Sequence, residues 1–206
     1  MTLMLSPAFA DSSSDGSQIL NGQVSLHTSI STLQTVIDNV GQSVGVQSTA
    51  AGNALDVTTM NDTHVNNDQY ASTIDISSDL GARVTNVGGD VAIQGQAVCN
   101  SASISTDPNI TAITSKQQCD AVDPTSRAYV DASNIGGSFS LANSAVGNTF
   151  EADSNAQNMP VDTLQINHSN VNAVTTANVS NVAGTVSVTS AAIGNNAQII
   201  HYSTSP

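Results

Sequence analysis

One segment of the chain recurs four times at nearly constant spacing, and this repeat restricts the possible folds more than any other feature. The four copies read GQSVGVQSTAAGNALDV, GGDVAIQGQAVCNSASI, GGSFSLANSAVGNTFEA and GTVSVTSAAIGNNAQII, and they begin at Gly41, Gly88, Gly136 and Gly184. Their starts therefore recur at intervals of 47, 48 and 48 in the numbering. A fixed period of this size is typical of repeat architectures in which each copy stacks on its neighbours.

Two asparagines recur within each unit. The first set lies just upstream of the copies, at Asn39, Asn86, Asn134 and Asn181. The second set follows a glycine in three copies (Gly52, Gly147 and Gly194) and Cys99 in the other, at Asn53, Asn100, Asn148 and Asn195. A Gly-Asn step can form a corner with a positive φ. One Asn per coil can also stack into an amide ladder. We therefore interpret both sets as structural ladders or corners, with ligand binding as the alternative.

The pattern inside the fourth copy indicates strands. Val186 and Val188 alternate with Thr and Ser, the pattern then breaks, and Ala197 and Ile199 resume it. Alternation of this kind predicts a strand with one buried face. Only 3% of the residues are aromatic and Trp is absent, and the small inward residues suit a narrow interior that has no room for aromatic rings. The prediction is an all-β fold, a β-solenoid of stacked β-arch coils.

The repeat leaves the size of one coil open. LQINHSNVNAV aligns with VSVTSAAIGNN at an offset of 22, pairing Leu164 with Val186. Each repeat could therefore consist of two coils of about 22–25 residues. Residues 105–130 fit this half-repeat badly, and we expect an irregular coil there. The alternatives are a disordered chain, a β-sandwich of duplicated domains, and a local helix over residues 30–44.

The beginning of the chain resembles an export signal. Ala8-Phe9-Ala10 before Asp11 has the small-x-small form of a signal-peptidase site. We interpret residues 1–10 as the remnant of a signal peptide with its true start upstream, and residues 11–206 as one solenoid domain. The sequence lacks an apolar run of the length that a transmembrane helix needs, so no such helix is expected. The predicted location is secreted, extracellular or at the outer cell surface.

The two cysteines, Cys99 and Cys119, fit an exported protein. The default for two cysteines in such a protein is one disulfide, which here would tie the expected irregular coil to its neighbour. Free thiols are the main alternative, and a catalytic cysteine lacks any local signature.

Charge excludes several classes of partner. Lys and Arg number 3 against 16 acidic residues, so nucleic acid and anionic membrane surfaces are not expected partners. The acidic residues are scattered, and neither a calcium-loop motif nor a common catalytic motif is present. We predict no enzyme activity, no metal and no cofactor.

Short motifs in the repeat resemble two families of bacterial surface proteins. CNSASI and GNNAQI are similar to the G-x-x-N-x-A core of curlin-type repeats, although Gln is sparse where curlin repeats place it regularly. The steps TAAGN, SAVGN and AAIGN resemble secreted holdfast-attachment proteins of stalked alphaproteobacteria, over residues 24–200. This resemblance implies an exported surface protein that anchors adhesive polysaccharide or builds a fibre.

We therefore expect a structural subunit of an extracellular filament or a cell-surface adhesive anchor. Each coil of a solenoid pairs its backbone with the next, so the end coils have open edges that can accept another subunit. The expected partners are further copies of the chain, joined head to tail, or other surface-fibre subunits, with polysaccharide as a further ligand. The alternative function is a monomeric adhesin, a glycan-binding β-solenoid module.

Overall fold

The computed structural model describes residues 17–60, 62–72, 75–107, 111–120, 123–156 and 158–202. The expected signal-peptide remnant lies outside these residues. The described chain forms twelve strands. They are β1 (Ser17–Ser25), β2 (Ser29–Val40), β3 (Val44–Thr59), β4 (Thr63–Ala71), β5 (Ile76–Val87), β6 (Val91–Thr106), β7 (Thr111–Cys119), β8 (Thr125–Ile135), β9 (Phe139–Ser154), β10 (Val161–Asn167), β11 (Asn172–Val182) and β12 (Val186–His201).

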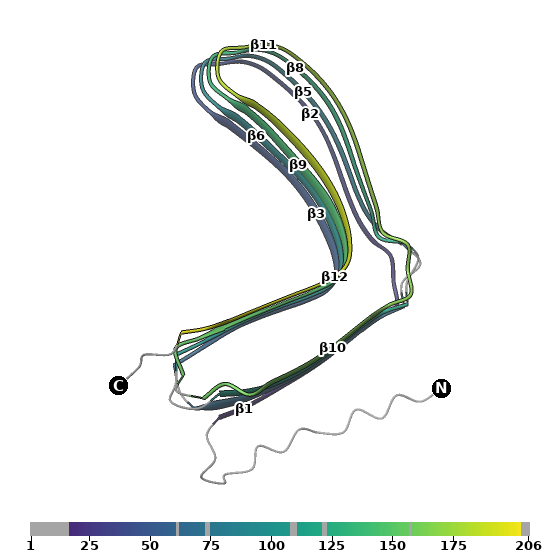
Figure 1. Cartoon of the computed structure of the whole chain (residues 1–206). Coiled ribbons are helices and arrows are strands. Elements are labelled where there is room, and N and C mark those ends of the chain that lie inside the picture. Colours follow the sequence, from purple (N-terminus) through teal and green to yellow (C-terminus); the bar gives the residue numbers. More distant parts are fainter. Residues whose placement is uncertain are drawn as a thin grey trace.

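Each successive group of three strands forms one coil, and four coils stack on one another (Figure 1). The stack contains three parallel sheets, which we call sheet A (β1-β4-β7-β10), sheet B (β2-β5-β8-β11) and sheet C (β3-β6-β9-β12). Residues one repeat apart pair directly, as Asn53 does with Asn100 and Asn100 with Asn148. This arrangement confirms the predicted all-β solenoid.

One coil takes up the whole repeat, so the structure does not contain the subdivision of each repeat into two shorter coils. Leu164 and Val186, which align at the shorter offset, lie in β10 and β12 and therefore in different sheets. Their strands look alike because both alternate apolar and polar residues. Residues 30–40, the first part of the segment considered for a local helix, lie in β2.

The segment where an irregular coil was expected contributes regular strands. β7 pairs with β4 and β10, and β8 pairs with β5 and β11, in the register of the neighbouring coils. The Asp-Pro steps lie at residues 107–108 and 123–124, between strands. Residues 108–110 and 121–122 lie outside the described part of the chain.

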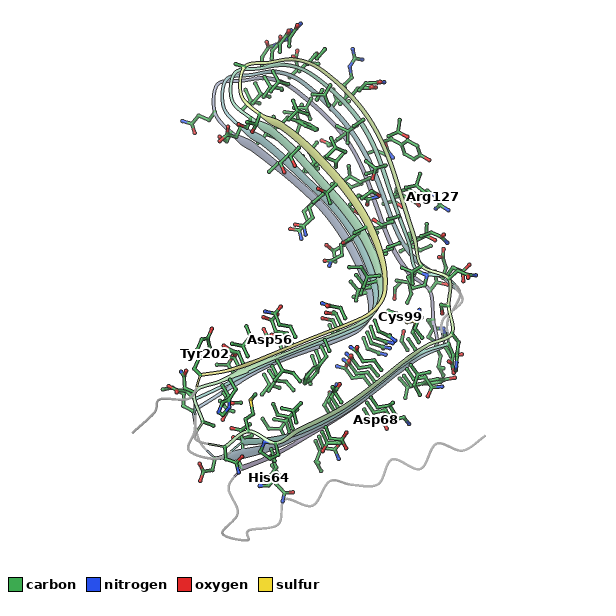
Figure 2. All side chains as sticks on the ribbon, viewed as in Figure 1. Asp56, His64, Asp68, Cys99, Arg127 and Tyr202 are labelled. Atoms are coloured by element: carbon green, nitrogen blue, oxygen red, sulfur yellow. A yellow bond between two sulfur atoms is a disulfide. The ribbon has the colours of Figure 1, made fainter. Side chains whose placement is uncertain are left out.

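The interior has two main apolar regions because sheet C bends and faces a different sheet on each side of the bend (Figure 1). Against sheet B, the first half of sheet C buries residues such as Ile93, Leu141 and Phe139. Against sheet A, its second half buries residues such as Ile104 and Phe150. Figure 2 shows side chains of successive coils stacked between the sheets. The expectation of an interior without room for aromatic rings is therefore wrong, because Phe139 and Phe150 are buried in the third coil.

The bend in sheet C coincides with the Gly-Asn step, but its backbone is not left-handed. The pairing of β9 with β12 passes from Val146 to Asn148 and omits Gly147. None of the described glycines has a φ in the left-handed region. Glycine is favoured here by close packing, since a Cβ on Gly52 would lie 2.6 Å from the Cys99 carbonyl oxygen. The expected positive-φ corner at this step is therefore wrong.

The left-handed backbone occurs instead at the upstream asparagines, Asn39, Asn86, Asn134 and Asn181, whose φ values are 57, 54, 57 and 52°. Asn tolerates this conformation better than most residues with a Cβ. In the second coil the irregularity leaves Thr85 and Asn86 facing outward while Val84 and Val87 both stay buried. The asparagine therefore shifts the strand's alternation by one residue and keeps both valines in the core.

Substitutions at Asn134 separate the backbone requirement from the side-chain contacts. We expect Asn134→Ala to lower the free energy of unfolding by about 1–2 kcal/mol, because alanine resists the left-handed conformation. Asn134→Gly keeps this conformation accessible and loses only the exposed amide contacts, so its effect is expected to be smaller. Urea unfolding followed by circular dichroism measures both. Equal destabilisation by the two variants would contradict the backbone explanation.

Candidate functional site: the amide columns and the end coils

The inner asparagines of sheet C form a continuous hydrogen-bonded column. Asn53 donates from Nδ2 to Oδ1 of Asn100, Asn100 to Asn148, and Asn148 to Asn195, at 2.7, 2.7 and 2.8 Å. Asn53, Asn100 and Asn148 are buried. Each of these three amides also donates to a backbone carbonyl of sheet A, at Tyr70, Gln118 and Ile166. The column is an amide ladder in the interior of the solenoid.

A second amide column, which the sequence reasoning missed, runs along sheet A. It consists of Gln23, Gln69, Gln117 and Gln165. In this column Gln69 donates from Nε2 to Oε1 of Gln23, Gln117 to Gln69, and Gln165 to Gln117, at 2.9, 2.8 and 2.8 Å. The available signal was the nearly constant interval between these residues, which is 46, 48 and 48 in the numbering. Regularly placed Gln is therefore present, although not in the segments that resemble curlin repeats.

The two columns connect sheets A and C reciprocally. Each Gln side chain donates to the carbonyl of the residue after an inner Asn, as Gln117 does to Thr149 at 2.8 Å. In the other direction, Asn100 donates at 3.0 Å to the backbone carbonyl of Gln118, which is the residue after Gln117. Buried amides with all their partners rigidify the interior that contains them. The register of sheet A against sheet C therefore depends on both columns.

The left-handed asparagines form a third column, on the outer surface. Asn181 donates to Asn134 and Asn134 to Asn86, at 3.1 and 2.9 Å, but Asn86 donates to a carboxylate oxygen of Asp38. Hydrogen bonds from Thr85 and then Asn86 hold the pKa of Asp38 below its usual value. At the first coil, Asp38 thus takes the acceptor position that an Asn occupies elsewhere.

Cys99 and Cys119 form a disulfide in the interior. Their Cα atoms are 6.0 Å apart, their sequence separation is 20, and both residues are fully buried. The bond joins the end of β7, in the third coil, to β6 in the second coil. Cys99 lies at the bend in sheet C, as Figure 2 shows. The disulfide therefore links two coils and two sheets at the point where the two apolar regions meet.

The two end coils leave strand edges unpaired, and the last coil also leaves core side chains exposed. Within the described residues, β1, β2 and β3 pair on one side only, and so do β10, β11 and β12. Val186, Val188 and Ile199 of the last coil are 52, 46 and 48% exposed. Their counterparts one and two coils earlier are 2% exposed or less. These side chains stand in line with the buried apolar residues of the preceding coils, but no further coil of the described residues packs against their other side.

The ionisable groups of the described residues do not converge on one place. Arg127 contacts Asp79 at 3.3 Å on the surface, and His168 contacts Asp120 at 2.6 Å at a corner. Burial acts to raise the pKa of Asp120, but hydrogen bonds from His168 and Gln118 outweigh it and lower this pKa. No group of three or more His, Cys, Asp or Glu residues suited to a metal ion occurs in the part of the chain that the structure describes.

These features define a disulfide-bonded β-solenoid that is held together by internal amide columns and has unpaired strand edges at both ends of its described part. The model of the holdfast attachment protein D (HfaD) family matches residues 6–201, and the chain belongs to this family. No curated protein and no solved structure matches the chain significantly. The family match supports the resemblance to holdfast-attachment proteins, whereas the likeness to curlin finds no such support.

Membership of the family indicates a surface-associated protein with a role in adhesion, at the cell surface or outside the cell. In the described residues, no helix is long and apolar enough to cross a membrane.

Proposed function

We propose that the protein is a structural subunit of an extracellular filament or of a cell-surface adhesive anchor. The observation that carries the proposal is the state of the end coils, where all three sheets have an unpaired strand edge among the described residues. Such edges are templates for pairing with another chain unless they are covered. A solenoid with two such ends can extend by adding coils from further subunits.

Export and the absence of catalysis belong to the same proposal. A buried disulfide between coils suits a protein secreted into an oxidising environment. Arg83, Lys116 and Arg127 are the only Lys and Arg residues of the sequence, so a role in binding nucleic acid has little electrostatic support. The protein acts mechanically, by connecting surfaces or subunits, without a cofactor.

Assembly is the property that tests this function. We expect the full chain, with its disulfide intact, to form species larger than a monomer as its concentration rises. Electron microscopy should reveal thin filaments, and aligned filaments should diffract at about 4.8 Å along the axis because the coils stack at the strand spacing. Each four-coil subunit then adds about 19 Å of length. Monodisperse monomers at every concentration and salt level would refute the filament.

A monomeric glycan-binding module is the second candidate. It is favoured by a shallow depression on the outer face of sheet B, lined by Arg83, Asp131, Asn178 and neighbouring Thr and Ser residues. Asn178 donates to Asp131 at 3.0 Å within it. Such polar groups can hydrogen-bond to sugar hydroxyls. Binding to a glycan array by a chain that remains monomeric, lost in Asn178→Ala, would favour this candidate over the filament.

A further inference from the structure

We propose that copies of the chain join in one direction only, with the last coil of one copy (β10–β12) stacked in register on the first coil of the next (β1–β3). This inference rests on the proposed function as a filament subunit, and it specifies the partner as a second copy and the contact as the two coil ends. Three features of the molecule favour this direction: the polarity of the amide columns, the alignment of the core columns and the placement of charge.

The amide columns run in opposite directions along the solenoid. In the Gln column, donors point toward the first coil, from Gln165 to Gln117 and finally to Gln23. In the inner Asn column, donors point toward the last coil, from Asn53 to Asn100 and finally to Asn195. Within each column, every amide except the terminal acceptor, Gln23 or Asn195, donates one N–H along the axis. Each end residue therefore has a donor or an acceptor directed out of the stack.

The two ends are therefore complementary. The first coil presents an Nε2–H of Gln23 and the side-chain Oδ1 of Asn53. The last coil presents the side-chain Oε1 of Gln165 and an Nδ2–H of Asn195. Head-to-tail stacking matches donors with acceptors in both columns. Contact between two first coils or two last coils brings like groups together and reverses the strand direction. Unmatched amides buried at such a contact oppose it.

The core columns continue across the same joint. Val188 stands at the end of the column formed with Leu141, Ile93 and Val46. In an in-register stack, Val188 of one copy covers Val46 of the next, and Ile199 likewise covers Val57. β3 and β12 both contain 16 residues, so the two strands can pair along their whole length and sheet C continues across the joint. Apolar side chains that are half-exposed in the last coil thereby become buried, which favours association.

Charge is low where the two copies meet, although the chain carries a formal charge of -13. The first and last coils contain three of the 16 acidic residues, Asp38, Asp56 and Asp162, and none of the Lys and Arg residues. Asp56 stands in one column with Ser103, Glu151 and Gln198, so the joint brings it next to an amide rather than another carboxylate. Repulsion between copies therefore arises mainly from the middle coils and is screened by salt.

Cysteine cross-linking tests the direction of the joint. Gln47 and Thr189 occupy one exposed column on the outer face of sheet C, with Gln94 and Ala142 between them. In the proposed joint, Thr189 of one copy lies beside Gln47 of the next at about 4.8 Å between Cα atoms, within the range for a disulfide. We expect Gln47→Cys mixed with Thr189→Cys to form covalent dimers on mild oxidation, and the double variant to form a ladder of oligomers.

The single variants and an out-of-register pair are the controls. Gln47→Cys alone reports contact between first coils, Thr189→Cys alone reports contact between last coils, and Val36→Cys with Thr189→Cys places the thiols on different sheets. Cross-linking of either single variant as strongly as the mixture would overturn the inference. Filaments without cross-links in any arm would also overturn it and leave the proposed function intact. Monomers on sizing would refute the function as a filament subunit itself.

A substitution at Gln23 tests the donor direction of the Gln column, and the concentration needed for assembly is the quantity measured. Gln23→Glu keeps the acceptor for Gln69 but removes both N–H groups of Gln23, the one that donates to the Ala54 carbonyl and the one directed at the next copy. We expect this variant to raise the concentration needed for assembly about tenfold, because a carboxylate then meets the Gln165 oxygen. Gln47→Glu, which adds the same charge to the outer face of the same coil, is expected to have little effect. Equal effects of the two variants, in chains that unfold at the same temperature, would contradict the ladder contact.

Discussion

Replacing Asn100 with aspartate is expected to lower the free energy of unfolding by about 3–5 kcal/mol. The substitution hardly changes the shape of the side chain, but it removes both donated hydrogen bonds, to Asn148 and to the Gln118 carbonyl. The new oxygen faces two acceptors in a position that is fully buried. Urea unfolding of the dilute chain, followed by circular dichroism, measures the loss.

Asn195→Asp provides the matched control at the end of the same column. Asn195 is exposed, its bond to the Gln165 carbonyl is 3.4 Å long, and the aspartate still accepts the bond from Asn148. The expected cost is about 1 kcal/mol. If the two substitutions destabilised the chain equally, the buried column would not be the source of stability that we assign to it.

Removing the disulfide is expected to lower the free energy of unfolding by about 3 kcal/mol. The bond closes a loop with a sequence separation of 20, and such a cross-link restricts the unfolded chain by about this amount. The thermal midpoint should therefore fall when the natural chain is reduced. The double variant Cys99→Ala/Cys119→Ala should unfold at a lower temperature in either condition.

The double variant also separates the cross-link from other effects of the reductant. Its thermal midpoint should not respond to reductant, because no other cysteine exists in the chain. A shift as large as that of the natural chain would show that the reductant acts elsewhere. Since the two alanines leave small cavities at fully buried positions, reduction of the natural chain is the better measure of the cross-link itself.

Local pattern was sufficient to predict several elements of this fold. The alternation of Val186 and Val188 predicted strands, and the repeat from Gly41 to Gly184 predicted stacked coils, because parallel in-register pairing joins residues one repeat apart. An Asn recurs among small residues at the same interval, as Asn100 does in the second copy, and this recurrence predicted that these side chains stack in a ladder. The Gln column was missed because its neighbours vary, as in GQV, DQY, KQQ and LQI, so only the interval marks it.

The strand content, the repeat and the two sets of recurring asparagines could thus be predicted from the sequence, since these depend on local alternation and on a constant interval. Tertiary structure alone decided that three strands make one coil, that sheet C faces two sheets, and that Asn134 rather than Gly147 takes the left-handed backbone. It also decided the opposite directions of the Gln and Asn columns. Those outcomes depend on which carbonyls and side chains meet across the interior, and residues such as Gln117 and Thr149 lie 32 positions apart in the chain.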